Sequence, residues 1–425
     1  MNTVARVQHE VAEDPTQFIS TSATDRAAVD YLNQLFRDAA RKGASDVHIE
    51  IRKDGGMVRL RIQGELETVA TARLQDAREY NNKIRMKCKL ALIEHQSSLD
   101  GKFRFDVDGR FVDVRVSILP LPDGQSIVCR LLDQSKSLKK LSELSMPDYV
   151  RQGINHIIQQ PQGLFLVTGP TGSGKTTTLY GVLQQLNTPK VKIITIEDPI
   201  EFEINGIVQA CLTPKMSFAG ALKSMLRQDP DAILVGEIRD TETARIAVQA
   251  ALTGHIVLST LHTNSATLTL NRLIDLGVDP NSLSAAMGGF MAQRLVRSLC
   301  PHCRRQVPIN AAHVNMIVST GIEAEHVANF AHLYEVNPHG CAECIEGWKG
   351  REPIFELIMP TPEAQIAIDT VDFKGFAQAA NLQSQYTTLK QSAMLLVLQG
   401  ITTLQEAIAV TGSSNTNTEA SIHEE

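Results

Sequence analysis

The chain has 425 residues, of which 43% are hydrophobic and 21% are charged, and its formal net charge is −6. These proportions are ordinary for a soluble globular protein and exclude disordered, collagen-like and coiled-coil chains, and the length predicts two or three domains. The negative net charge disfavours a protein that coats nucleic acid.

Both ends of the chain are polar. Residues 1–24 predict a flexible N-terminus, with acidic residues where a signal peptide needs an apolar segment, and residues 412–425 predict a disordered tail. No apolar run reaches the roughly 18 residues that a membrane-spanning helix requires. We therefore expect a cytoplasmic protein, or one bound peripherally at the inner face of a membrane.

Residues 25–133 predict a small α+β domain. Its first helix is expected to begin near Asp25, because apolar residues follow at helical spacing, and to end before Gly43. Alternating apolar and polar residues over 47–51 and 57–62 flank a glycine turn, which predicts a β-hairpin.

A second strand-rich stretch, 103–119, belongs to the same domain, and the polar segment 134–145 after it predicts a linker. From Gly163 onward the chain contains short, solidly apolar runs: LFLV, KIITI, AILV and HIVLSTL. Fully apolar strands are typical of a parallel sheet that helices cover on both faces, and 241–254 has the composition of such a helix. We predict an α/β domain over 146–411.

The segment GPTGSGKT matches the full P-loop pattern, between the predicted strand LFLVT and a predicted helix. In this pattern backbone N–H groups converge on phosphates, Lys175 supplies a positive charge, and Thr176 offers a hydroxyl to Mg²⁺. A glycine-rich turn that binds nothing is the alternative, and the correct flanks disfavour it. We predict that ATP is bound by Gly169, Pro170, Thr171, Gly172, Ser173, Gly174, Lys175, Thr176 and Thr177.

Three further predicted strands end in polar residues. KIITI leads into Glu197 and Asp198, AILVG into Glu237, and HIVLSTL into His262. The carboxyl ends of parallel strands form the ligand crevice of an open sheet, so these groups should gather around the phosphates. Each alone also fits a structural role, such as a turn or a solvated cap, but four strand ends with the same logic favour one site.

Two C-x-x-C pairs interrupt the region beyond Leu268, whose pattern otherwise predicts helices. Two such pairs are typical of a closed tetrahedral zinc site, whereas a redox pair needs a different strand and helix context and a disulfide is disfavoured in the cytosol. The remaining cysteines are expected to be small packing residues. We predict a structural Zn²⁺ within residues 300–344, bound by Cys300, Cys303, Cys341 and Cys344.

The order and spacing of four segments resemble the secretion ATPase superfamily, which drives type II secretion and type IV pilus assembly. GPTGSGKTTTLY, ITIEDPIEF, LRQDPDAILVGEIRD and TGHIVLSTLHTNSA resemble its Walker A motif, aspartate box, Walker B motif and histidine box. ASDVHIE and VDVRVSILPLPDGQSIVCRLLD resemble its second N-terminal domain. The resemblance implies an α/β fold with a RecA-like P-loop core, preceded by the small α+β domain and followed by a helical part with the zinc element.

The resemblance also implies a homo-hexameric ring that hydrolyses ATP with Mg²⁺ and acts on an inner-membrane platform protein, without direct contact to nucleic acid. It implies that Glu197 and Glu237 share the activation of water and the binding of Mg²⁺, in a division that the sequence leaves open. His255 and His262 lie in the histidine box, and His262 is the better candidate for sensing the γ-phosphate.

Members of this superfamily bring arginines of the N-terminal domain to the nucleotide, some of them across a subunit boundary. Arg115 matches one such position, with an outward-facing strand residue as the structural alternative. The other expected arginine is replaced by Lys102, and Arg104 is a candidate substitute. Lysine lacks the planar fork of arginine, so this departure weakens the expected contact.

The tetracysteine element resembles the assembly and secretion members, since retraction members usually lack it. The alternatives are a retraction or DNA-uptake motor of the same superfamily, a DNA-translocating conjugative P-loop motor, and a ring that binds nucleotide without hydrolysis. The net charge disfavours the DNA motor, and the presence of Lys175, Thr176, Glu197 and Glu237 disfavours the silent ring.

Overall fold

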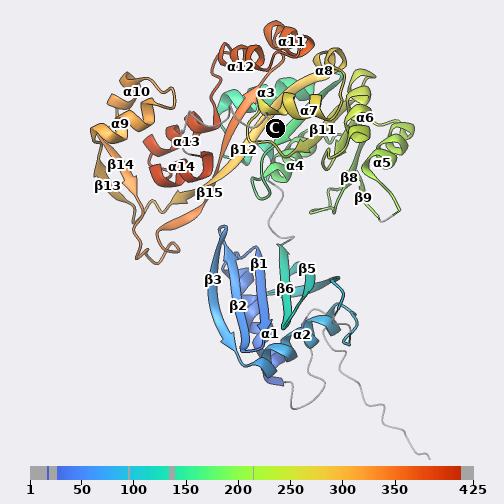
Figure 1. Ribbon diagram of the computed structural model, residues 1–425, viewed down its shortest axis with the longest axis vertical. Helices are drawn as coiled ribbons and strands as arrows, with labels where there is room; N and C mark the ends of the chain where they lie inside the picture. Colours follow the sequence, from blue (N-terminus) through green and yellow to red (C-terminus); the bar gives the residue numbers. More distant parts are fainter. Residues whose placement is uncertain (1–16, 19–25, 94–95, 134–138, 214, 413–425) are drawn as a thin grey trace, which may run out of the picture. The chain divides into compact units, whose positions relative to one another are not determined.

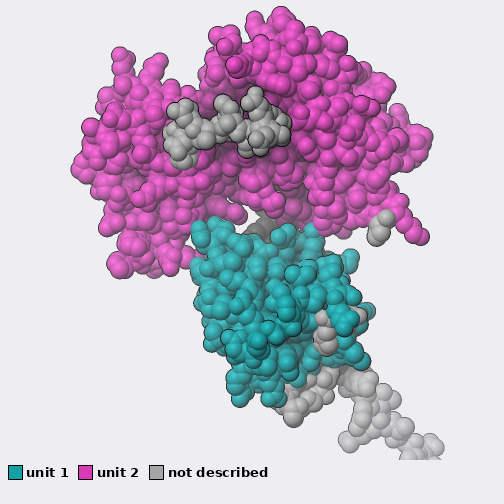
Figure 2. Space-filling view, in the orientation of Figure 1, with its two compact units in different colours: residues 1–137 teal, residues 138–425 magenta. Residues whose placement is uncertain are grey.

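The chain folds into two compact units, residues 1–137 and residues 138–425, which Figure 2 shows in different colours. The computed structural model describes residues 17–18, 26–93, 96–133, 139–213 and 215–412. Most of the predicted flexible N-terminus and all but Gly412 of the predicted tail lie outside the described residues.

Unit 1 contains a six-stranded antiparallel sheet and two helices (Figure 1). The strand order is β3-β2-β1-β6-β5-β4, and α1 and α2 pack against each other and against β1. The elements are α1 (Arg26–Arg41), β1 (Asp46–Arg52), β2 (Gly55–Ile62), β3 (Glu65–Ala72), α2 (Leu74–Lys87), β4 (Leu99–Val107), β5 (Arg110–Leu121) and β6 (Gly124–Asp133).

Alternation along the strands gives this sheet one apolar and one charged face. Val47 and Ile49 of β1 are fully buried, whereas the alternate residues His48 and Glu50 are only partly buried. Helix α1 buries Phe36 and its neighbours at helical spacing. Since successive side chains of a strand point to opposite faces, the helices cover the face of Val47 and leave the other to polar residues.

Unit 2 is built on a seven-stranded sheet with the order β15-β12-β7-β11-β10-β8-β9. The predicted apolar runs are confirmed as parallel strands β7 (Gly163–Thr168), β8 (Ile193–Glu197), β10 (Ala232–Val235) and β11 (Ile256–Leu261), and β9 (Val208–Cys211) continues the parallel pairing.

Helices cover both faces of this sheet. Phe165 and Val167 of β7 belong to a core shared with α3 (Asp148–Gln159) and α4 (Lys175–Leu186). Leu164 and Leu166 belong to a second core, shared with α5 (Phe218–Met225) and α6 (Thr241–Leu252). A strand with helices on both faces has no polar side, which explains its solidly apolar sequence.

The region beyond Leu268 differs from the helical expectation. After α7 (Leu268–Asp275) and α8 (Pro280–Ala286) the chain forms β12 (Met287–Leu299), which pairs in parallel with β7 and antiparallel with β15 (Trp348–Ile358). The sequence MGGFMAQRLVRSL is rich in helix formers, and its two strand partners, β7 and β15, are both distant in the sequence. Tertiary pairing therefore overrides local propensity.

The remaining elements include two small strands around the cysteine pairs and a helical C-terminal part. They are β13 (Arg305–Pro308), α9 (Ala311–Val318), α10 (Ala324–Ala328), β14 (His332–Glu335), α11 (Pro362–Asp369), α12 (Phe373–Asn381), α13 (Leu389–Leu398) and α14 (Leu404–Thr411), with single 3₁₀ turns at Leu141–Glu143 and Leu226–Gln228. No helix among the described residues is long and apolar enough to cross a membrane.

The second half of the predicted linker is packed onto unit 2. Leu141 is only 2% exposed, and Arg151 of α3 donates hydrogen bonds to the carbonyl oxygens of Leu141, Leu144 and Met146. Residues 134–138 lie outside the described residues.

Candidate active site

The loop between β7 and α4 has the backbone of a phosphate cradle. Gly169, Gly172 and Gly174 have φ values of 147°, 81° and 87°, which side chains of L-residues rarely adopt. A Cβ on Gly169 would lie 2.4 Å from the carbonyl oxygen of Gln293, and one on Gly174 would lie 2.8 Å from the side-chain nitrogen of the same residue. Glycine at these positions therefore lets the loop pack directly against β12.

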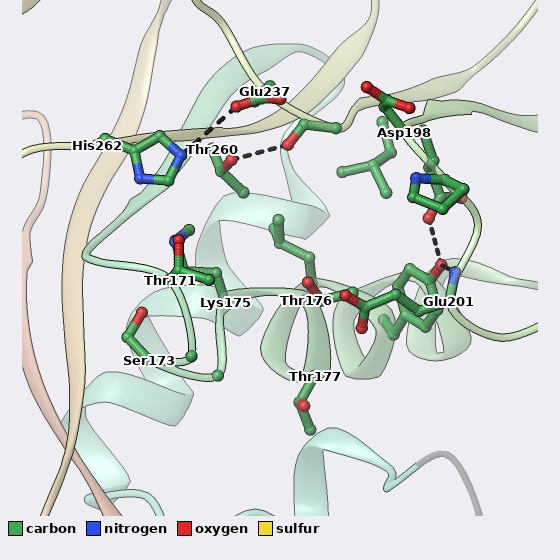
Figure 3. Close-up of a pocket in the computed structure, with 18 of the residues that line it drawn as sticks. Thr171, Ser173, Lys175, Thr176, Thr177, Asp198, Glu201, Glu237, Thr260 and His262 are labelled. Carbon is green, nitrogen blue, oxygen red and sulfur yellow. Dashed lines mark hydrogen bonds and ion pairs between the residues drawn. The ribbon is translucent and has the colours of Figure 1, made fainter. Parts of the chain in front are cut away.

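A cavity of about 440 Å³ opens beside this loop. Figure 3 shows Thr171, Ser173 and Lys175 on one side of it and Glu237 and His262 on the other. Residues 171–177 line it, whereas Gly169 and Pro170 do not. The carboxyl ends of three strands, β8, β10 and β11, supply the other polar groups. The structure thus brings the P-loop and the polar strand ends into one cavity.

Lys175 is held close to the P-loop backbone. Its Nζ donates hydrogen bonds to the carbonyl oxygens of Gly169 at 2.7 Å and Pro170 at 3.0 Å. Burial lowers the pKa of Lys175, while the carboxylates of Glu237 and Glu201 act in the opposite direction. The ammonium therefore lies in a cavity that it shares with carboxylates.

Two hydroxyl groups of the loop are placed to meet a ligand. Thr176, at the start of α4, faces the cavity in Figure 3. Ser173 is 3% exposed, and its hydroxyl has no hydrogen-bond partner within the part of the chain that the structure describes. A buried hydroxyl without a partner is costly, and phosphate oxygens held by this loop would satisfy it. The donor set therefore fits a nucleoside triphosphate.

Glu197 is a wall residue with both oxygens occupied. It is 5% exposed, and Oε2 accepts a hydrogen bond from the hydroxyl of Tyr180. Oε1 accepts from the hydroxyl of Thr195 at 2.7 Å and from the side-chain amide of Gln209 at 3.2 Å. These contacts hold the loop after β8 in place and favour a structural role for this carboxylate.

Glu237 lies just after β10, and its carboxylate interacts electrostatically with the ammonium of Lys175. Its Oε1 is 2.6 Å from a guanidinium nitrogen of Arg239, and its Oε2 is 3.5 Å from Nε2 of His262. The side chain of Glu237 is 13% exposed, and that of His262 is 50% exposed. The hydroxyl of Thr260 donates to the carbonyl oxygen of Gly236 at 2.8 Å, which fixes the backbone before Glu237.

The structure adds two charged residues that the sequence reasoning missed. Glu201 lines the cavity and lies near Lys175, whose pKa it raises. Its position four residues after Glu197 was visible, but the spacing does not tell which carboxylate of the segment faces the phosphates. Arg351 of β15 also lines the cavity, and no local pattern could place it there because β15 itself was not predicted.

The two histidines of the predicted histidine box lie apart. His262 lines the cavity at the carboxyl end of β11, whereas His255 precedes the amino end of that strand. The imidazole of His255 interacts through Nδ1 with the carbonyl oxygen of Ala250 at 3.0 Å. His255 therefore caps α6 on the opposite edge of the sheet.

The predicted arginine of unit 1 lies in a row of charged residues across the exposed sheet face. Arg115 of β5 is directly opposite Arg130 of β6 on one side and Lys102 of β4 on the other. Arg130 also contacts Asp46, with 3.0 Å between nitrogen and oxygen. Arg104 is bound to Asp113 at 2.8 Å on the same sheet. The row thus gathers three cationic side chains on one sheet face, with the carboxylate of Asp46 beside Arg130.

The four cysteines of the two C-x-x-C pairs converge. Their sulfur atoms all lie within 4.8 Å of one another, and the pairs Cys300–Cys341, Cys303–Cys344 and Cys341–Cys344 are separated by 3.7, 3.6 and 3.6 Å. Four thiolates at a zinc–sulfur distance of about 2.3 Å around a tetrahedral ion have sulfur separations of about 3.8 Å. The cluster therefore fits a Zn²⁺ with no open coordination position.

Comparison with known proteins agrees with this geometry. The sequence profile of the family described as Type II/IV secretion system protein matches residues 21–409. Type II secretion system protein E of Dickeya dadantii is 42% identical over 390 residues, which cover 91% of this chain and 76% of that protein. The type IV pilus assembly ATPase PilB of Pseudomonas aeruginosa is 39% identical over 396 residues, covering 92% of this chain and 69% of that protein.

Solved structures show a related fold. The pilus retraction motor PilT with bound ADP superposes with a TM-score of 0.60 at 27% identity, covering 89% of this chain and 96% of the other. The Legionella pneumophila ATPase DotB has a TM-score of 0.66 at 20% identity, covering 94% and 97%, and this likeness concerns the fold alone. Since the family profile spans most of the chain and both curated relatives are close to 40% identical, this chain belongs to the Type II/IV secretion system protein family.

Proposed function

We propose that this protein is a Mg²⁺-dependent ATPase that powers the assembly of type IV pili or of a type II secretion pseudopilus through an inner-membrane platform protein. The observation that carries the proposal is the single cavity that combines the P-loop, Lys175, Glu201, Glu237 and His262. Relatives named as a type II secretion protein and as a pilus assembly ATPase support the biological role.

The charged and hydroxyl-bearing residues of the P-loop and of the strand ends have distinct chemical roles in this proposal. Lys175 exchanges its carbonyl acceptors for phosphate oxygens. Thr176 and Glu237 would hold Mg²⁺, which when bound would neutralise phosphate charge. Glu201 orients the attacking water, since phosphoryl transfer depends mainly on positioning and charge. Glu197, which the sequence reasoning placed among the catalytic residues, instead fixes the wall.

We further propose that the active form is a homo-hexamer in which unit 1 of one subunit supplies cations to unit 2 of another. The cavity holds two permanent cations, Lys175 and Arg351, beside several carboxylates, so a triphosphate there would gain from additional positive charge. The row of Arg130, Arg115 and Lys102 carries such charge. Arg104 is paired with Asp113, which favours Lys102 over Arg104 as the partner of Arg115.

We also propose that Zn²⁺ at the cysteine cluster is structural. With four sulfur ligands the ion has no position for water or substrate, so it would link segments of chain without taking part in hydrolysis. Cys300 directly follows β12, and Cys344 lies shortly before β15. A bound ion therefore joins the ends of two paired strands. Zinc of this kind favours an assembly or secretion motor over a retraction motor.

The proposed role is tested by adding the proposed partners to the purified protein. ATP turnover would be measured alone, with vesicles that carry the platform protein, and with double-stranded DNA. We expect the platform vesicles to raise turnover, while empty vesicles and DNA leave it unchanged. Stimulation by DNA alone would contradict the proposal and favour a DNA-translocating motor.

A further inference from the structure

The loop that carries His262 is tied to the P-loop strand at its start. Residues 262–267 connect β11 to α7. The backbone N–H of Thr263 donates to the hydroxyl of Thr168 at 2.7 Å. Thr168 ends β7 and immediately precedes the P-loop. This contact fixes the chain next to His262, and the hydroxyl groups of Thr263 and Ser265 add hydrogen bonds within the loop.

Arg294 of β12 holds the middle of the loop. Its Nη2 donates to the carbonyl and side-chain oxygens of Asn264, both at 3.2 Å. Its Nη1 donates to the carbonyl oxygen of Val410 in α14 at 3.1 Å. The guanidinium is therefore fixed at two ends, which makes it a rigid support for Asn264, two residues after His262.

Glu356 of β15 lies close to the end of the loop, near the backbone of Ala266 and Thr267. Glu356 is only 3% exposed, and Oε1 of its carboxylate accepts a hydrogen bond from the hydroxyl of Tyr386 at 2.9 Å. Burial raises the pKa of this carboxyl group, while hydrogen bonds from Tyr386 and from the backbone N–H groups of Leu389, Thr267 and Ala266 lower it. Thr267 and Leu389 lie at the starts of α7 and α13, where backbone dipoles favour a negative charge.

These contacts form one support beneath the loop. Glu356 acts on Arg294 electrostatically, from the neighbouring strand of the sheet. On the cavity side, Figure 3 shows His262 directed toward Glu237. Neither Arg294 nor Glu356 lines the cavity. They can therefore influence a ligand there only through the residues that they hold.

We propose that Arg294 and Glu356 are positioning residues for His262, and that they set the preference of the site for ATP over ADP. This inference rests on the proposed function, in which His262 senses the γ-phosphate. With the support intact, the imidazole stays beside Glu237, where it meets a γ-phosphate. Without the support, the loop keeps its contact with Thr168 and its internal hydrogen bonds but loses its anchor at Asn264, so the imidazole is held less firmly. Binding of ADP, which lacks the γ-phosphate, is unaffected.

Glu356→Gln tests this proposal, because the amide keeps the shape but replaces one acceptor oxygen with a donor. Dissociation constants would be measured for a non-hydrolysable ATP analogue and for ADP. We expect affinity for the analogue to fall by about 10-fold and affinity for ADP to change by less than about 2-fold, typical of coupling between residues in one network. Glu352→Gln makes the same change on the same strand and should leave both affinities unchanged.

A double-mutant cycle with His262→Ala decides whether Glu356 acts through the histidine. In that case Glu356→Gln adds no loss of analogue affinity once His262 is alanine. Equal losses for the analogue and ADP, or losses that add in the double variant, would overturn the proposal. Fluorescence of Trp348, the single tryptophan, reports whether β15 stays folded.

A second variant keeps the test decisive if Glu356→Gln does not fold. Arg294→Lys retains the charge but loses the fork that joins Asn264 to Val410. Selective loss of analogue affinity in this variant supports the proposal, and an unchanged preference for the analogue overturns it. Failure of the wild-type protein to bind either nucleotide would instead contradict the proposed ATPase function, so the two failures are distinguishable.

Discussion

Changing Glu197, Glu201 and Glu237 to glutamine one at a time separates the carboxylates that act on phosphates from the one that holds the cavity wall. The amide keeps the size of each side chain and removes its negative charge. Glu201 and Glu237 both lie close enough to Lys175 to raise its pKa, whereas both oxygens of Glu197 accept hydrogen bonds from other groups. We therefore expect the three variants to fail in different ways.

Glu197→Gln should mainly lose stability. The two oxygens of Glu197 accept hydrogen bonds from Tyr180, Thr195 and Gln209, and an amide group can replace only one of those oxygens as an acceptor. Leaving a buried donor unsatisfied costs about 1–3 kcal/mol. In a domain of roughly 150–250 residues each kcal/mol lowers Tm by about 2–4 °C.

Glu201→Gln and Glu237→Gln should mainly lose turnover. Removing one group that stabilises or positions the reacting atoms typically costs about 10²- to 10³-fold in kcat. Both side chains are less buried than Glu197, so their Tm should change little. Phosphate release at saturating ATP gives kcat, and thermal unfolding gives Tm. Glu203→Gln, an exposed neighbour outside the cavity, is the control.

Loss of turnover in Glu197→Gln at an unchanged Tm, together with full activity in Glu201→Gln, would contradict this division of roles. That result would return the catalytic role to Glu197, as the sequence alone suggested, and would mean that its hydrogen bonds rearrange when nucleotide binds.

Three further predictions concern the zinc and the positive charges. Removal of zinc, or Cys303→Ser, should lower Tm and raise KM for ATP, because strands β12 and β15 connect the cysteines to the cavity residues Leu295 and Arg351; freshly purified reduced protein without zinc would contradict the metal assignment. Arg351→Gln should weaken ATP binding by about 10-fold through loss of a charged contact, and unchanged affinity in direct titration would exclude that contact. Mixtures of Arg115→Ala and Lys175→Ala subunits should regain part of the activity that each lacks; mixtures as inactive as both parents at every ratio would show that Arg115 does not act between subunits.

The P-loop and the strands around it could be predicted because their signals are local. The apolar runs form β7, β8, β10 and β11, because a strand that is buried on both faces needs apolar residues at every position. The polar residues at their carboxyl ends met in one cavity because parallel strands share an edge. Only His255 lies at the other end of its strand.

What the sequence could not provide depends on long-range pairing and side-chain direction. Strand β12 has the composition of a helix and exists as a strand because β7 and β15 pair with it, and the pairing with β15 also brings Arg351 to the cavity. The roles of Glu197 and Glu201 were not separable, because the difference lies in contacts with Tyr180 and Gln209. These contacts join segments whose spacing carries no motif.

If ATP is hydrolysed in the cavity beside the P-loop, turnover depends on Lys175, and the variant Lys175→Ala measures that dependence. Phosphate release would be measured at saturating ATP with Mg²⁺, beside wild type and beside Lys190→Ala, which removes a lysine outside this cavity. We predict that wild type and the control turn over ATP only when Mg²⁺ is present, and that Lys175→Ala loses at least about 10²-fold in kcat. Equal rates for Lys175→Ala and wild type would show that ATP is not hydrolysed in this cavity.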